Sequence, residues 1–454
     1  MSNTQRINRA SRELDRYLDD LTLTRYHYQV FAVCILLVLI DGYDGATLTY
    51  AAPAIVAAIK LDPAALGPLF AAHLVGMVLG SGPSGLIADR RGRRPTIIGA
   101  TVVFGLFTVL MATATSFTEI LIYRLLTGIG LGAAVSNTVA LASELSPGYC
   151  RTTVVSVIYS GFPLGALVGG YIAVVMLHAF GWHSIFLLGG ALTMAILPAV
   201  IWKMPESPRF LQTSGASSVR VREALMRLGL DPGNAAAPAG ERPGALIAGR
   251  SPLRDLFVDG MAIGTLLLWL AFFVNQLLVY FMFTWLPIVF KSRGLSSDLG
   301  IVASATLNFG GVVGAICLAR LIDAHGARRV LTITYIGAFL INAVFGSVAS
   351  AGAVVVLSTV AFTGFVLNGS NVNLAAVATG LYPTRARSTG VGWAIGIGRV
   401  GAITGSLIGG VLLRTQLRLS LLYPLVGSIL LLAALAMWVM HRRPPAIPMQ
   451  ARLG

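Results

Sequence analysis

The chain has 454 residues, of which 56% are hydrophobic and only 11% are charged, and its formal net charge is +15. A soluble domain carries about 25% charged residues, so this composition excludes an ordinary soluble protein and indicates a chain that lies largely in a membrane. The basic residues fall between apolar segments, which argues against a nucleic-acid partner.

The first 27 residues are polar and rich in arginine, and they predict a short cytoplasmic amphipathic segment. They are not a cleavable signal, because the apolar segment that follows is too long and no small-residue cleavage site ends it. Twelve apolar segments follow, each long enough to cross a bilayer as a helix. We expect them at about 28–57, 65–88, 95–114, 119–143, 152–176, 184–202, 259–290, 297–321, 329–349, 353–380, 388–413 and 419–440.

The first span contains two carboxylates, Asp41 and Asp44, in the run Asp41-Gly-Tyr43-Asp44. Each costs on the order of 2.5–3.5 kcal/mol at the centre of a membrane helix. A rise of 1.5 Å per residue places Asp41 about 20 Å into the span, and the i, i+3 spacing puts both carboxylates on one face. One member of a like-charged pair in low dielectric can hold a proton near neutral pH, so we interpret the two as a proton-carrying site.

Positive residues set the orientation. Of the 33 Lys and Arg residues, 26 fall in the N-terminal segment, the central polar segment, the C-terminal tail and the loops on that same side, against five in the opposite loops. The positive-inside rule therefore predicts that both termini are cytoplasmic. The predicted organisation is a cytoplasmic segment at 1–27, a six-helix bundle at 28–202, a cytoplasmic linker at 203–258, a second six-helix bundle at 259–440 and a tail at 441–454.

The two halves repeat each other. The loop at 85–94, GLIADRRGRR, returns 234 positions later at 319–328 as ARLIDAHGAR, and the glycine-rich run at 161–170 returns 240 positions later at 401–410. Two six-helix bundles related in this way, with a central site, are a transporter architecture.

Two arginines lie within predicted spans. Arg399 is roughly 17 Å into the eleventh span, too deep for easy snorkelling, so it needs an anion: Asp41 or Asp44 in an empty site, or a substrate carboxylate. Arg124 is only about a turn and a half into the fourth span, from where it could reach the outer water. Further aromatic and amide side chains could frame a substrate pocket. These are Tyr43, Tyr159, Asn275, Gln276, Tyr280, Asn308 and Trp393.

The loop at 85–94 matches the signature G-x-L-a-D-R-x-G-R-[RK] of the major facilitator superfamily, and the run Pro205-Glu206-Ser207-Pro208-Arg209 resembles an element of several of its symporter families. The D-G-[FY]-D run at 41–44 resembles the aromatic acid:proton symporter family, and the chain is identified as a member of that family. The resemblance implies a major facilitator fold, in which the 85–94 cluster closes the cytoplasmic side, and a role for the arginine in span four. The second copy of the signature has Ala324 and Ala327 where the first has Arg90 and Arg93, so we expect a weaker gate there.

The gate cluster also follows from the residues. Gly85 and Gly92 permit close approach and a tight turn, Asp89 can accept from a helix N-terminus, and the arginines can pair with Glu144. The predicted gate residues are Gly85, Asp89, Arg90, Gly92, Arg93, Glu144, Asp323 and Arg328.

The sequence shows no catalytic constellation, phosphate-binding loop or metal-ligand spacing, so we expect no enzyme, no metal and no cofactor beyond protons as the coupling ion. The prediction is a monomeric importer of a small aromatic carboxylate, hydroxybenzoate-like, by proton symport in a bacterial inner membrane. A symporter of sugar acids or other aliphatic anions stays open, as does a non-transporting aromatic-acid chemoreceptor.

Overall fold

The computed structural model describes residues 22–214, 226, 256–258, 261–292, 294, 296–348, 352–382, 384–415 and 417–442. The predicted N-terminal segment before residue 22, most of the linker at 203–258 and the tail beyond residue 442 lie outside this range. The part that is described is helical and contains no strand.

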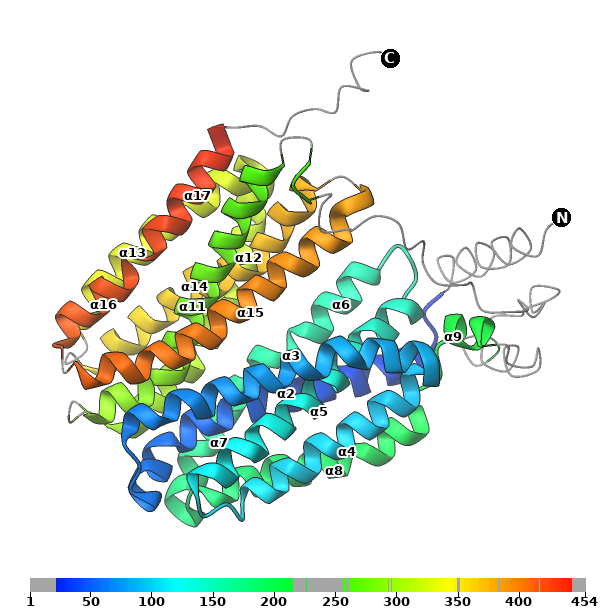
Figure 1. Cartoon of the computed structure of the whole chain (residues 1–454), viewed down its shortest axis with the longest axis horizontal. Coiled ribbons are helices and arrows are strands. Elements are labelled where there is room, and N and C mark those ends of the chain that lie inside the picture. Colours follow the sequence, from blue (N-terminus) through cyan, green and yellow to red (C-terminus); the bar gives the residue numbers. More distant parts are fainter. Residues whose placement is uncertain are drawn as a thin grey trace. The chain divides into compact units, whose positions relative to one another are not determined.

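Within the described ranges, twelve spans are long and apolar enough to cross a membrane, and each coincides with a predicted one to within a few residues at either end. The chain is therefore an all-α, multi-pass membrane protein (Figure 1). The helices are α2 (Arg25–Ile59), α3 (Leu66–Arg91), α4 (Arg93–Met111), α5 (Phe117–Leu145), α6 (Arg151–Tyr159), α7 (Gly161–Phe180), α8 (His183–Lys203), α9 (Pro208–Thr213), α11 (Ala262–Ser292), α12 (Ser297–His325), α13 (Ala327–Val348), α14 (Ala353–Leu381), α15 (Thr384–Arg414), α16 (Leu419–Gly427) and α17 (Leu430–Arg442), with a 3₁₀ turn, η1, at Pro63–Ala65.

Two of the predicted spans are each built from two helices. The fifth is interrupted between α6 and α7 at Ser160. Pro163 explains the interruption, because a proline ring clashes with the carbonyl four residues earlier, here that of Tyr159. The twelfth span tightens between α16 and α17, where the amides of Leu431 and Leu432 bond three residues back instead of four.

The helices group into two compact units. The first contains residues 1–45, 75–165 and 183–248, and in it α4 packs against α5 and α8. The second contains residues 46–74, 166–182 and 249–454. In this second unit α11 packs against α15, α12 against α14, and α13 beside α16 and α17 (Figure 1). The second unit thus combines the later part of α2, the start of α3 and most of α7 with the second-half helices. The predicted division into bundles at 28–202 and 259–440 stays a prediction.

Gly42 brings two helices of the first unit into close contact. A Cβ atom at this position would lie 2.8 Å from the Cα of Phe162 and 2.6 Å from its carbonyl carbon, so the backbones of α2 and α7 touch here. Real Cβ atoms do not approach a backbone so closely, and only glycine fits without moving a helix. The close packing of α2 and α7 therefore requires glycine at position 42.

We predict that Gly42→Ala destabilises the protein by about 1–3 kcal/mol, the usual cost of overpacking, because the obstacle is main chain that cannot rotate away. Gly45→Ala is the matched control, since its added Cβ would meet only the Phe162 ring at 3.5 Å. Thermal unfolding in detergent should show a clear loss for Gly42→Ala and little change for Gly45→Ala. Equal melting temperatures for both variants would contradict the packing argument.

Candidate functional site

A buried ion pair lies at the centre of the first unit. An Oδ2 atom of Asp44 on α2 is 3.2 Å from the Nη1 atom of Arg124 on α5, and the same nitrogen lies 3.4 Å from the Asp44 main-chain oxygen. The two side chains are 1% and 2% exposed. Charges so deeply buried must be paired, because each is costly to remove from water and the attraction between them offsets much of that cost.

The local sequence aims both side chains inward. On α5 the buried positions Ile120, Arg124, Thr127 and Leu131 recur at three- and four-residue spacing, so Arg124 lies on the packed face of the helix. On α2 the ring of Tyr43 packs at Gly189, and its hydroxyl donates to the carbonyl of Ile185 at 2.9 Å. This contact ties the carboxylate segment of α2 to α8.

Thr108 on α4 completes the surroundings of the carboxylate. Its Oγ1 atom is 3.2 Å from Asp44 Oδ1 and 2.9 Å from the carbonyl oxygen of Phe104. Sequence reasoning missed this residue, because threonines in apolar helices commonly bond to the carbonyl four residues back and nothing in the pattern links Thr108 to α2.

The structure corrects the expectation that Arg124 could reach the outer water: its side chain turns into the protein and is buried. Its guanidinium pairs with Asp44. The pairing of Arg399 with Asp41 or Asp44 stays a prediction. The Arg124 Nε atom is buried without a hydrogen-bond partner among the described residues, so this guanidinium retains an unused donor.

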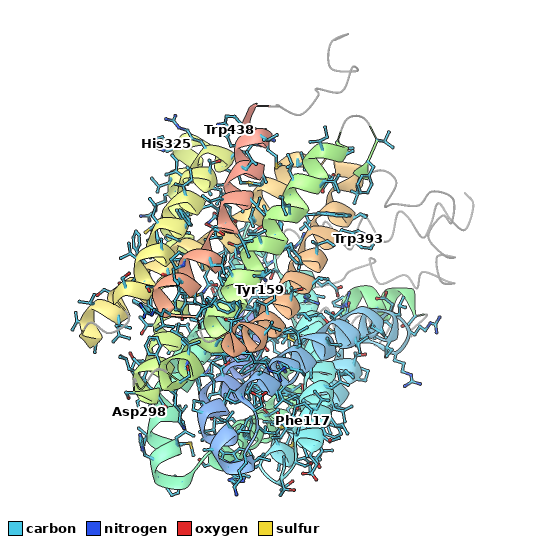
Figure 2. The ribbon with its side chains drawn as sticks, turned by 60° about the vertical axis from the view of Figure 1, so that its left-hand side comes forward. Phe117, Tyr159, Asp298, His325, Trp393 and Trp438 are labelled. Atoms are coloured by element: carbon cyan, nitrogen blue, oxygen red, sulfur yellow. The ribbon has the colours of Figure 1, made fainter. Side chains whose placement is uncertain are left out.

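The other predicted proton carrier, Asp41, lies one turn earlier on α2 and is also buried. Both carboxylates of the run at 41–44 therefore face the interior, as their spacing predicts. The structure places Tyr43 beside them with its hydroxyl already bonded to Ile185. Tyr159, at the end of α6, is 51% exposed (Figure 2).

The remaining candidates lie in the second unit. Asn275 on α11 is fully buried and neither amide atom has a partner in the described part of the chain, and the Gln276 Oε1 atom is in the same condition. Asn308 on α12 donates to the Ser304 carbonyl at 3.1 Å. Trp393 on α15 stacks on Trp269, with ring centroids 6.0 Å apart (Figure 2). Tyr280 is half-buried on α11, and Arg399 is half-buried on α15 near the level of Gln276, which packs at Gly398.

A second charged cluster joins the loop at 85–94 to the end of α5. Arg93 contacts Glu144 through Nε at 2.8 Å and Nη2 at 2.7 Å, and Glu144 also accepts from the Ser207 hydroxyl at 2.6 Å. Another Arg93 nitrogen donates to Asn137 at 3.3 Å. The predicted pairing of Arg93 with Glu144 is therefore present, and Ser207 and Asn137 add to it.

Glu206 also belongs to this charged cluster. Its Oε1 atom accepts from the main-chain nitrogens of Arg93 at 2.7 Å, Arg94 at 3.3 Å and Ser207 at 2.9 Å. A carboxylate at a helix N-terminus is favoured by the helix dipole, and here it caps α4. Gly92 has φ of 101°, a conformation that only glycine adopts readily, and Gly326 in the second copy of the loop has φ of 86°.

The other predicted gate residues are not joined to this cluster. Asp89 and Arg90 are exposed and no hydrogen bond or ion pair links Asp89 to another described residue, while Gly85 faces open space. In the second copy Asp323 is exposed, and Arg328 donates to the Met440 carbonyl at 2.9 Å. No group of three metal-ligating side chains occurs in the described ranges.

A family model described as Major Facilitator Superfamily matches residues 34–364 and 297–453. The chain belongs to the major facilitator superfamily. A gallate transporter of Pseudomonas putida is 36% identical over 436 residues, which cover 95% of this chain and 96% of the relative. A 4-hydroxybenzoate transporter of the same organism is 35% identical over 419 residues, 91% of this chain and 92% of the relative. These matches confirm the resemblance to the aromatic acid:proton symporter family.

Solved structures confirm the fold of this superfamily member. A D-xylose–proton symporter superposes with a TM-score of 0.72 at 21% identity, covering 91% of this chain and 97% of the other. The inward-open form of the xylose transporter XylE from E. coli also gives 0.72, at 18% identity, covering 93% and 98% of the two chains. Twelve apolar helices and bacterial relatives in this superfamily indicate a multi-pass protein of the inner membrane.

The ion pair predicts an unequal response to its two partners. Asp44→Asn should cost about 3–5 kcal/mol, because it leaves a buried guanidinium that cannot lose its charge. Arg124→Gln should cost less, because Asp44 can take up a proton, and the deficit should shrink as pH falls. Chemical unfolding in detergent should therefore give the double variant Asp44→Asn/Arg124→Gln a higher free energy of unfolding than Asp44→Asn alone. Additive losses would show that the two residues do not interact.

Proposed function

We propose that this protein imports a small aromatic carboxylate, hydroxybenzoate-like, by proton symport through alternating access, with both termini in the cytoplasm. Two observations support the substrate class and the coupling ion. Relatives that share 33–36% identity over nearly the whole chain are named as gallate or 4-hydroxybenzoate transporters. The buried pair of Asp44 and Arg124 supplies one group that can hold a proton and one that can hold a carboxylate.

The pair couples these two events. While Asp44 is ionised, it occupies Arg124. When Asp44 accepts a proton, Arg124 keeps its positive charge and becomes a buried cation that needs another anion. A substrate carboxylate fills that need, and guanidinium geometry suits a carboxylate. Proton binding therefore favours substrate binding, and loss of either favours loss of the other.

The charge balance follows from this scheme. A monoanion entering a cell against a negative-inside potential loses about 2.3 kcal/mol per 100 mV. One proton on Asp44 makes the translocated load neutral, so the pH gradient alone drives uptake. A second proton on Asp41 would add the membrane potential as a driving force. The cycle uses protons and substrate alone, with no other cofactor, in a single chain. In the second unit, Arg399, Gln276 and Asn275 are the predicted polar lining of the path.

The substrate panel tests the proposed class. Purified protein in vesicles should accumulate 4-hydroxybenzoate, gallate or a related benzoate when the outside is acidic, and should fail to accumulate galactonate or glucose. Accumulation of galactonate without any benzoate would move the assignment to sugar acids. Saturable binding of benzoates with no accumulation at any pH gradient would indicate a receptor.

Asp44→Asn tests the coupling. This variant should abolish uphill accumulation but retain exchange of labelled for unlabelled substrate, because the amide mimics the protonated carboxyl and Arg124 still accepts the substrate. Bound 4-hydroxybenzoate should also raise the melting temperature of Asp44→Asn more than that of the original chain, since it restores a partner to Arg124. Undiminished accumulation in this variant would remove Asp44 as the coupling residue.

A further inference from the structure

The Thr108 hydroxyl has one hydrogen and two acceptors. The Phe104 carbonyl oxygen lies 2.9 Å away and the Asp44 Oδ1 atom 3.2 Å away, while Arg124 holds the other carboxylate oxygen, Oδ2. Thr108 is fully buried, so water does not compete for the hydroxyl. A hydroxyl can therefore donate to only one of these acceptors at a time.

Charged and polar groups of several helices surround Asp44. Arg124 on α5 brings the positive charge, and α2 itself brings Asp41 and Tyr43. Beside Asp44 on α2, the Phe162 ring of α7 lies at Gly45 and the Ile185 main chain of α8 lies at Tyr43, and neither is charged. On α4, Thr108 is bonded to the carboxyl, and its hydroxyl can change its hydrogen-bond acceptor without a change of charge.

We propose that Thr108 is a positioning residue whose hydroxyl donates to Asp44 when this carboxyl is ionised, returns to Phe104 when it is protonated, and so sets the pH at which Asp44 releases its proton. The inference rests on the proposed function and names a further residue of the same site. A hydrogen bond to an ionised group is stronger than one to a neutral group, so the hydroxyl favours the carboxylate. The threonine keeps its own proton throughout and only rotates, while Asp44 gains or loses the coupling proton.

The test is the pH profile of 4-hydroxybenzoate exchange in vesicles at equal pH on both sides. Exchange requires protonated Asp44 and therefore falls at alkaline pH. Thr108→Val should move that alkaline limb upward by about one pH unit, because the carboxylate has lost a donor. Thr108→Ser keeps the hydroxyl and should restore the original profile.

Thr101→Val is the matched control. Thr101 is also fully buried on α4, and its hydroxyl donates to the Ile97 carbonyl alone at 2.8 Å among the described residues. An unmoved limb in Thr108→Val, or an equal shift in Thr101→Val, would overturn the assignment while exchange by the original chain leaves the proposed function standing. Absence of exchange in the original chain would instead overturn the proposed function.

A different observation concerns two ion pairs at the other end of the helices, all within the second unit. Arg414, the last residue of α15, lies 2.7 Å from Asp62, which caps the turn before α3. His178, in the last turn of α7, lies 3.0 Å from Asp298 in the first turn of α12. Asp298 and His325 lie at opposite ends of α12 (Figure 2).

The internal repeat relates these pairs. It superposes α7 on α15 at an offset of 240 residues and α3 on α12 at an offset of 234, so each pair joins the end of one helix to the beginning of another in the same symmetric way. Next to the pairs the helices meet closely: a Cβ at Gly67 would lie 3.2 Å from the Leu407 carbonyl oxygen, and one at Gly170 would lie 2.6 Å from the Ala305 Cβ.

We infer that the two pairs are a latch that holds first-half segments against second-half helices. The Ala64 amide and then Arg414 hold the pKa of Asp62 below its ordinary value, so this arm stays ionised at any pH near neutral. Its stabilisation is lost only when pH falls through that lowered pKa. Lys60, Lys291 and Arg418 are further described charges at this end of the second unit, and Lys291 donates to the Pro53 carbonyl at 3.1 Å.

The latch is tested by labelling a buried thiol. In a chain whose three native cysteines are replaced by serine, Ser406→Cys places a thiol at a fully buried site beside Gly67. A membrane-impermeant maleimide added outside should label it several-fold faster when Asp62→Arg or Arg414→Asp is present alone, and at the original rate when both are present. Failure of the double swap to slow labelling would overturn the latch.

Discussion

The protein depends on two opposite charges held out of water inside a membrane domain. The pair of Asp44 and Arg124 is stable only while three helices keep their places: α2 presents the carboxylate, α5 the guanidinium and α4 the Thr108 hydroxyl. Gly42 and Tyr43 are consecutive residues of α2; Gly42 packs this helix against α7, and Tyr43 bonds it to α8. Removing one charge is far more costly than removing both, and this is the physical basis of the linkage that we propose between proton and carboxylate binding.

The two halves of the chain use their shared architecture unequally. In the first half, Arg93, Glu144 and Glu206 bind the loop at 85–94 to the end of α5 and to the chain after α8. In the second copy, Arg328 bonds a main-chain carbonyl and Asp323 is exposed. The repeat therefore preserves the turn, with glycine at positive φ in both copies, while the charged contacts differ. The weaker second gate that the alanines at 324 and 327 predict stays a prediction.

The membrane spans can be predicted from the sequence, whereas the partners of Asp44 cannot. Spans are long and continuous in their hydropathy, so their existence and approximate ends follow from local composition. The partner of Asp44 does not follow from local composition, because Arg124 is 80 residues away and its depth in the helix suggested that its side chain reaches water. Burial of the face containing Ile120 and Thr127 decides which way it turns. Thr108 carries no signal at all, since a threonine bonded to its own helix looks identical to one that also serves a carboxylate.

The central claim is that a carboxylate substrate binds together with a proton taken up by Asp44. The most direct measurement is the pH change of a weakly buffered solution of purified protein, near neutral pH, when 4-hydroxybenzoate is added. The account predicts uptake of about one proton for each molecule bound, and none in Asp44→Asn, which should still bind the substrate. Binding by the original chain with no proton uptake across the range in which exchange declines would contradict it.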